Sequence, residues 1–117
     1  MKRKILIVED NVSLSQRQKD WFEQAGYDAM TAMNEPAARA LIRKHQFDLI
    51  LSDVRLPEGD GISLLEWLKK EKRDIPFIIT TEYVSVPDVV RTIRLGAKDY
   101  LPKPVPVSYT HLTLPTT

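Results

Sequence analysis

Residues 47–53 read Phe-Asp-Leu-Ile-Leu-Ser-Asp, an apolar run that ends at Asp53. The start of the chain has the same form, because Glu9 and Asp10 follow the apolar run from Lys4 to Val8. Short continuous apolar runs are typical of strands that are buried on both faces of a parallel sheet. The carboxyl ends of parallel strands lie along one edge of the sheet. We therefore expect the three acids to meet at that edge.

Strand-like runs alternate with segments of helical periodicity, which is typical of βα units that build a parallel sheet. We predict five strands, at residues 4–8, 27–31, 47–52, 75–80 and 98–101. Four helices are predicted to begin near residues 12, 34, 62 and 87. The apolar stripe of the last helix contains Val86, Val89, Val90 and Ile93. Right-handed crossovers would place helices on both faces of the sheet, giving a doubly wound α/β fold.

Composition limits the classes of function that are open to the chain. Its 117 residues are enough for one domain with a core. With 17 Lys and Arg against 16 Asp and Glu, the formal net charge is +1, so we expect no direct binding of nucleic acid. The absence of cysteine excludes disulfides and thiolate zinc sites. No apolar run approaches the roughly 20 residues that span a bilayer, and we expect a cytoplasmic protein without a membrane segment.

Each strand-end acid has an ordinary structural explanation when it is taken alone. Glu9 and Asp10 could cap the following helix, and Asp53 could bond to a loop. Three converging carboxylates are different, because like charges at close range are unfavourable unless a cation or a proton compensates them. A hard cation with oxygen ligands is the natural solution, and magnesium uses one or two carboxylates and several waters.

Two further strand ends add groups that suit a phosphoryl ligand. Lys103, followed by Pro104, comes after the last strand; its ammonium could form a plain salt bridge or contact a phosphoryl oxygen. Thr81 ends the fourth strand and could donate its hydroxyl to the same oxygen, although threonine is also common in strands. Because side chains alternate along a strand, Thr80 and Thr81 should point to opposite faces.

These motifs together resemble the receiver domain of two-component response regulators. The resemblance covers residues 3 to about 105 and includes the acid pair, Asp53 followed four residues later by Pro57, the strand end at Thr81, and the segment 100–104, Tyr-Leu-Pro-Lys-Pro. It implies a flavodoxin-like fold with strand order 2-1-3-4-5. The loop after Asp53 is also similar, more weakly, to that of the sigma-54-activating (NtrC-like) regulators.

The resemblance implies a role for each residue of the site. Asp53 would be the nucleophile that accepts a phosphoryl group and forms an aspartyl phosphate. Mg²⁺ would be bound by Asp10, Asp53 and the backbone carbonyl of Arg55, with Glu9 acting through water. Lys103 would offset charge on the transferring group. Thr81 would then move toward the phosphoryl oxygen and Tyr100 would turn inward, which creates a new surface on the fourth helix and fifth strand.

The implied partner is a sensor histidine kinase or a phosphotransfer protein. The surface of the fourth helix and fifth strand is a candidate dimer contact, and the controlled output would be transcription. The only chemistry would be the domain's own phosphorylation and dephosphorylation. Glu82 departs from the family pattern, which has a small residue there, and this keeps open a phosphorylation-independent interaction module. A phosphohydrolase with an aspartyl nucleophile is disfavoured, because Arg55 occupies the place of its second aspartate.

The end of the chain has a different character. Residues 107–117 contain four threonines and a proline but no Asp, Glu, Lys or Arg. They also lack a helical apolar stripe. They resemble a translated sequencing-adapter read-through. We therefore expect a truncated receiver over residues 1–106 and a non-native or disordered tail over 107–117. The fifth helix of the fold and any output domain would then be absent from this chain.

Overall fold

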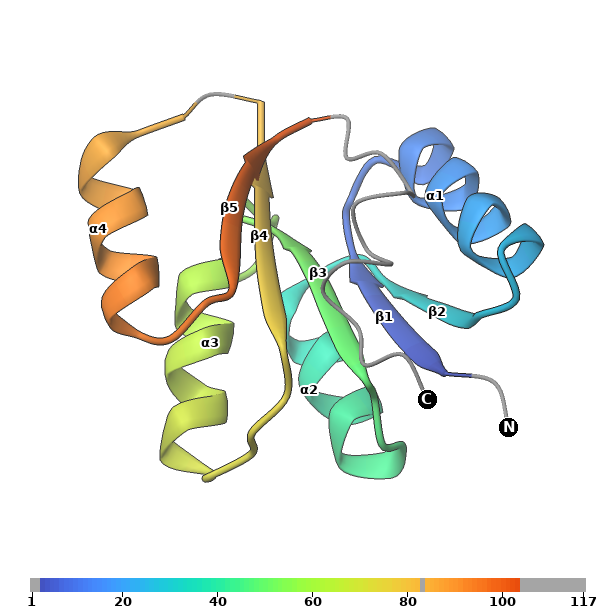
Figure 1. The fold of residues 1–117 in the computed structure, drawn as a ribbon, viewed down its shortest axis with the longest axis horizontal. Helices are drawn as coiled ribbons and strands as arrows, with labels where there is room; N and C mark the ends of the chain where they lie inside the picture. The colour runs from blue at the N-terminus through green and yellow to red at the C-terminus, as the bar shows by residue number, and fades with distance from the viewer. Residues whose placement is uncertain (1–2, 83, 104–117) are drawn as a thin grey trace.

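The computed structural model describes residues 3–82 and 84–103, in which strands and helices alternate. The elements, shown in Figure 1, are β1 (Lys4–Val8), α1 (Val12–Gln24), β2 (Asp28–Ala32), α2 (Glu35–Lys44), β3 (Leu49–Asp53), α3 (Gly61–Lys70), β4 (Phe77–Thr81), α4 (Val86–Arg94) and β5 (Asp99–Pro102). The described residues thus contain the five predicted strands and the four predicted helices.

All neighbouring strands of the sheet pair in parallel, in the order β2-β1-β3-β4-β5. The doubly wound, flavodoxin-like α/β fold with order 2-1-3-4-5 is therefore confirmed. The register places Val8 beside Ser52, Asp53 beside Thr80, and Thr81 beside Pro102. The carboxyl ends of β1, β3, β4 and β5 consequently lie along one edge, where the functional residues were expected.

The boundaries of β2, β3, β4 and β5 differ from the prediction by one or two residues. Tyr27 precedes β2, which begins at Asp28, and its N–H donates to Phe22 O at 2.9 Å in the turn after α1. Phe47 precedes β3, which begins at Leu49. The predicted fourth strand began at Ile75, but Pro76 has no N–H for the ladder and β4 begins at Phe77.

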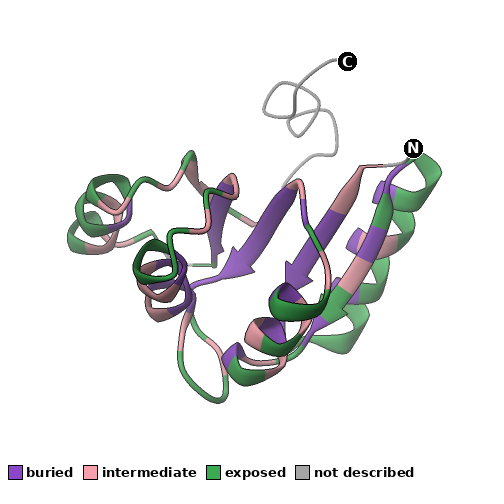
Figure 2. Cartoon of the chain, turned by 90° about the horizontal axis from the view of Figure 1, so that it is seen from below, coloured by how far each residue is buried: buried purple, intermediate pink, exposed green. Residues whose placement is uncertain are grey.

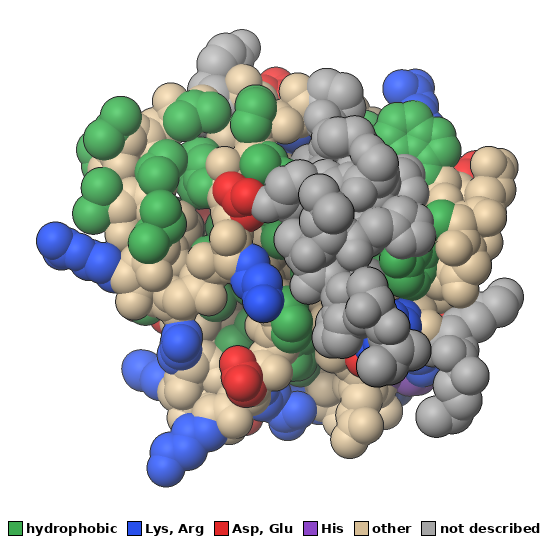
Figure 3. Space-filling view, viewed as in Figure 1, with side chains coloured by type: hydrophobic (Ala, Val, Ile, Leu, Met, Phe, Trp, Pro, Cys, Tyr) green, Lys and Arg blue, Asp and Glu red, His purple; other side chains and the backbone are tan. Residues whose placement is uncertain are grey.

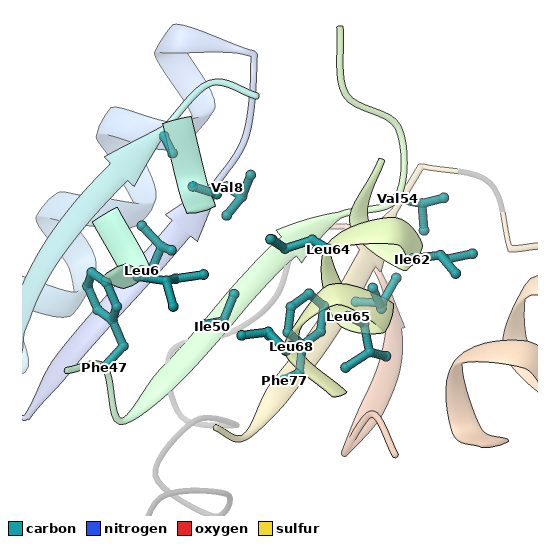
Figure 4. Packing of buried hydrophobic residues seen from close by; sticks show 14 residues of the cluster. Leu6, Val8, Phe47, Ile50, Val54, Ile62, Leu64, Leu65, Leu68 and Phe77 are labelled. Atoms are coloured by element: carbon teal, nitrogen blue, oxygen red, sulfur yellow. The ribbon is translucent and has the colours of Figure 1, made fainter. Parts of the chain in front are cut away.

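The two faces of the sheet carry separate apolar clusters. On one face, α2 and α3 pack through residues such as Ile42 and Leu64 against the strands. Figure 4 shows Leu64 and Leu68 of α3 on the same face of the sheet as Leu6 and Ile50. On the other face, α1 packs through Phe22 against a cluster that includes Ile5, Leu49 and Ile78. Figure 2 shows that the central strands are buried along their length. This double covering explains why the strands read as continuous apolar runs.

The apolar stripe of α4 is exposed, whereas helical periodicity would normally indicate a core-facing side. Val86 is 72% exposed, Ile93 is 59% exposed, and Val90 is exposed as well. Thr92 is the buried residue of this helix. Figure 3 shows apolar side chains gathered over α4. The same helix therefore leaves an apolar surface next to β5, the edge strand.

Some expectations from the sequence fall outside the described residues. These are the fifth helix, the boundary at residue 106 and the tail over 107–117. Within the part of the chain that is described, no helix has the length and apolar character needed to cross a membrane.

Candidate functional site

Three carboxylates meet at the carboxyl edge of the sheet, as the sequence predicts. Glu9, Asp10 and Asp53 each present one oxygen, and these oxygens lie within 4.8 Å of one another. Glu9 is buried, Asp10 is exposed, and the side chain of Asp53 is 11% exposed. The cluster therefore combines buried negative charge with one ligand that is open to solvent.

Lys103 places its ammonium between two of these carboxylates. Its Nζ donates to Asp53 Oδ2 at 2.8 Å and also forms an ion pair with Glu9 Oε1. The backbone N–H of Lys103 donates to Thr81 O at 2.9 Å, which continues the β4–β5 ladder by one residue and fixes the side chain's origin. Burial acts to lower the pKa of the Lys103 ammonium, but the hydrogen bonds with Asp53 and Glu9 outweigh it and raise this pKa.

Glu9, which follows β1, is held in place by hydrogen bonds of both its backbone and its side chain. Its backbone N–H donates to Ala32 O of β2 at 2.9 Å, and its Oε2 accepts from the N–H of Asn11 at 3.1 Å. Burial is the largest influence on Glu9 and raises the pKa of its carboxyl, and the charge of Asp53 adds to this. The bonds from Lys103 and Asn11 oppose the rise without cancelling it. The single ammonium of Lys103 does not balance the three carboxylates, and a divalent cation would compensate the negative charge that remains.

The loop after Asp53 folds back tightly against it. The N–H of Arg55 donates to Asp53 Oδ1 at 3.3 Å, and the N–H of Gly61 donates to Val54 O at 2.8 Å. A Cβ atom on Gly61 would overlap the backbone oxygen of Asp53, so only glycine allows this approach. The backbone at Asp53, the candidate phosphoacceptor, is therefore held by contacts with residues of the loop that follows it.

The two threonines of β4 have different surroundings. Thr80 donates its hydroxyl to Ser52 O at 3.3 Å, which is a structural bond between neighbouring strands. Thr81 is buried at the strand end and interacts with Tyr100 through its side chain. This difference agrees with the predicted alternation and leaves Thr81 as the hydroxyl at the site.

Tyr100 on β5 packs against the α2–α3 cluster, and its hydroxyl oxygen is buried. Within the described residues this hydroxyl has no hydrogen-bond partner of good geometry. Burial is the largest influence on the Tyr100 phenol and raises its pKa, whereas the Ser85 backbone and the Thr81 side chain act to lower it. The ring therefore lies inward, on β5 and next to α4, the two elements that the resemblance links to switching.

Comparison with known proteins decides the family. A family model described as the response regulator receiver domain matches residues 5–113. The chain belongs to this family. The polar-differentiation response regulator DivK of Brucella anthropi is 37% identical over 109 residues, which cover 92% of this chain and 89% of that protein.

Solved receiver domains share the fold. A CheY-like receiver domain protein from Methanospirillum hungatei has a TM-score of 0.89 and 30% identity, covering 97% of this chain and 90% of its own. A response regulator from Burkholderia pseudomallei has a TM-score of 0.88 and 28% identity, covering 98% of this chain and 68% of its own. That protein was solved with a phosphorylated aspartic acid, a calcium ion and citrate.

Family membership carries a function. Receiver domains of two-component systems switch by phosphorylation on an aspartate, and they interact with histidine kinases or phosphotransfer proteins. They bind Mg²⁺ at an acidic pocket, and Glu9, Asp10 and Asp53 form such a group in this receiver domain. The donor set fits a hard cation, since all three ligand atoms are oxygens. The output type and the NtrC-like resemblance stay predictions, as does the cytoplasmic location.

The structure brings the predicted side chains at the strand ends to the same edge, namely Glu9, Asp10, Asp53, Thr81 and Lys103, whereas Tyr100 pairs with Ile79 two residues before the end of β4. It also adds two residues that sequence reasoning missed. Gly61 and Glu35 lie outside the resemblance motifs, yet Gly61 touches the Asp53 backbone and Glu35 binds the loop that follows. The run of turn-forming residues over 57–61 signalled a tight loop. Nothing in that run indicated that a helix elsewhere holds it.

Proposed function

We propose that Asp53 is the phosphoacceptor of this receiver domain. One carboxylate oxygen of Asp53 forms a bond to phosphorus while the P–N bond of a phosphohistidine breaks, and the imidazole of the kinase or phosphotransfer protein leaves with the bonding electron pair. The observation that carries this proposal is the contact of Lys103 Nζ with Asp53 Oδ2 inside a cluster of three carboxylates. Of the three acids, Asp53 is the one in contact with both Lys103 and the Arg55 amide.

The cation ligands that we propose are Asp10, Asp53 and the backbone carbonyl of Arg55, with Glu9 acting through water. Mg²⁺, when bound, supplies positive charge that offsets the charge of the transferring phosphoryl group. Lys103 supplies the second positive charge from the β5 side. Because Lys103 already pairs with Glu9 and Asp53, its ammonium is positioned before the phosphoryl group arrives.

Thr81 and Tyr100 are the proposed switch residues. Thr81 would donate its hydroxyl to a phosphoryl oxygen on Asp53, which alters its interaction with Tyr100. The helix α4, which carries the exposed apolar residues, contacts β5, the strand of Tyr100. A shift of Tyr100 would therefore change a surface that a partner, a second copy or an output domain could bind. Control of transcription through such an output is part of the proposal.

A phosphorylation-independent interaction module is the second candidate, and Glu82 is the observation that favours it. This exposed carboxylate follows Thr81 directly and adds negative charge next to the place that a phosphoryl group would occupy. A phosphohydrolase is disfavoured, because Arg55 stands two residues after Asp53 and offers no carboxyl as a general acid.

The test is covalent labelling of the chain with acetyl phosphate and Mg²⁺, followed by intact mass measurement. We expect the mass to increase by one phosphoryl group, and we expect Asp53→Asn to abolish this increase. Asp48→Asn is the matched control, since Asp48 lies at the opposite end of β3 and bonds to the N–H of Lys4. Full labelling of Asp53→Asn would refute Asp53 as the acceptor, and an unlabelled wild type would favour the interaction module.

A further inference from the structure

Glu35 is a buried acid on the far side of the loop that follows Asp53. It is 5% exposed and occupies the first position of α2, directly after the cap residue Asn34, whose Oδ1 accepts from the N–H of Ala37 at 2.8 Å. Its Oε2 forms an ion pair with Arg39, one helical turn later. An anion at a helix N-terminus and beside a cation is well placed electrostatically. Burial of an acid nevertheless calls for a further structural reason.

That reason is a set of contacts with residues 58–60 of the loop between β3 and α3. Glu35 Oε1 accepts from the N–H of Asp60 at 3.1 Å, and the N–H of Glu35 donates to Glu58 O at 3.1 Å. Between these two bonds, Gly59 has a φ of +80°, and a Cβ atom there would overlap Glu35 Oε1. The backbone of residues 58–60 therefore lies directly on the Glu35 carboxylate.

The same loop continues to the phosphoacceptor candidate. Asp60 pairs with Arg55 in an antiparallel bridge, and the N–H of Arg55 donates to Asp53 Oδ1 at 3.3 Å. Glu35 is thus connected to Asp53 through one hydrogen bond to Asp60, one backbone bridge and one hydrogen bond from Arg55. No side chain of α2 has to reach the carboxyl edge for this connection to exist.

On the side of α2, the loop of residues 58–60 borders open space, so its position there depends on its hydrogen bonds to Glu35. A cavity of about 380 Å³, open to solvent, is lined by Glu35, Pro36, Arg39, Arg43, Glu58 and Gly59. If the Glu35 carboxylate were removed, the Asp60 N–H would lose this acceptor, and water from the cavity could take its place. Residues 58–60 would then have fewer constraints on their position.

We propose that Glu35 is a positioning residue for the phosphoryl site: its carboxylate holds residues 58–60 and thereby places the Arg55 backbone beside Asp53. This inference rests on the proposed function, because it assigns Glu35 to the cation and phosphoryl site around Asp53. Groups that orient metal ligands without touching the metal commonly change metal affinity by 10- to 100-fold when they are lost. Glu35 acts through the backbone of Arg55, a proposed ligand.

The experiment compares Glu35→Ala and Glu35→Gln with Ile42→Val in the full chain. Ile42 is buried on the same helix and is not bonded to the loop, so Ile42→Val perturbs α2 without touching residues 58–60. Two quantities are measured: the hydrogen exchange rate of the Arg55 amide without metal, and the Mg²⁺ dissociation constant by calorimetry. Glu35→Gln keeps an acceptor for the Asp60 N–H and serves as the conservative variant.

We expect Glu35→Ala to weaken Mg²⁺ binding about tenfold or more and to speed exchange at Arg55. Glu35→Gln should show a smaller loss, and Ile42→Val should match the wild type in both measurements. If the wild type binds Mg²⁺ and is labelled on Asp53, but Glu35→Ala behaves like Ile42→Val, this inference alone is overturned. If the wild type neither binds Mg²⁺ nor is labelled, both the proposed function and this inference are refuted.

Discussion

Two neighbouring helices, α3 and α4, are of similar length but are attached to the sheet very differently. α3 buries five residues, among them Ile62, Leu65 and Leu68, whereas α4 buries Thr92. The start of α3 is closed by Asp60, whose Oδ1 accepts from the N–H of Ser63 at 2.6 Å. Ser85, at the start of α4, makes no such bond with its side chain.

The difference shows where this domain can change shape at low cost. Elements with few buried apolar contacts open and shift more easily than those in the core. α3 follows the proposed phosphoacceptor and keeps its loop fixed, while α4 follows the proposed switch residue Thr81 and is free to respond. The firmly packed helix α3 thus adjoins the proposed phosphoryl site, and the loosely packed helix α4 adjoins the proposed switch residues.

The largest expected effect on stability comes from a substitution in the buried side of α3, compared with one on the exposed side of α4. Leu65→Ala removes a side chain that is 3% exposed and should lower the free energy of unfolding by about 2–5 kcal/mol. Ile93→Ala, on the exposed stripe of α4, should change it by about 0.5 kcal/mol or less. Urea unfolding followed by circular dichroism measures both. Equal losses for the two variants would mean that α4 is anchored as firmly as α3.

A smaller effect is expected at the two helix starts. Asp60→Ala removes the bond to the Ser63 N–H and should cost about 1 kcal/mol. Ser85→Ala removes no capping bond, so we expect no measurable change in the same unfolding experiment. A loss at Ser85 as large as that at Asp60 would contradict the difference in capping.

The smallest effect concerns Tyr100 and appears at high pH. Burial raises its pKa above the ordinary value of 10.0, so the folded chain favours the neutral phenol. The resulting stability is fully present below pH 10 and is lost as the pH rises through the raised pKa of the folded state. Tyr100→Phe should match the wild type at neutral pH, because the buried hydroxyl has no well-placed partner among the described residues, and it should lose less stability in alkali.

Thermal unfolding at neutral and alkaline pH measures this difference between Tyr100→Phe and the wild type. A Tyr100→Phe variant that is clearly less stable at neutral pH would instead indicate that the hydroxyl forms a strong hydrogen bond in solution. Such a result would make β5 and α4 more tightly coupled than the comparison with α3 suggests.

Part of the site was predictable because its information is local. Glu9, Asp53 and Lys103 each end a short apolar strand, and parallel topology alone then brings strand ends together. The role of Glu35 was not predictable, because its bond to Asp60 spans 25 residues and depends on the path of an irregular loop. The exposure of Val86 and Ile93 was missed for another reason: periodicity indicates an apolar side of a helix but not what covers it.

The ion pair between Lys103 and Glu9 joins residues that are 94 positions apart in the sequence. A chain emerging from the ribosome therefore has no lysine ammonium beside Glu9 and Asp53 until β5 has been synthesised and has paired with β4. Loop closure over such a distance comes late, after the local βα units have formed. Competence for phosphoryl transfer would then appear only after β5 has joined the sheet, so that folding intermediates without β5 would not take up the signal.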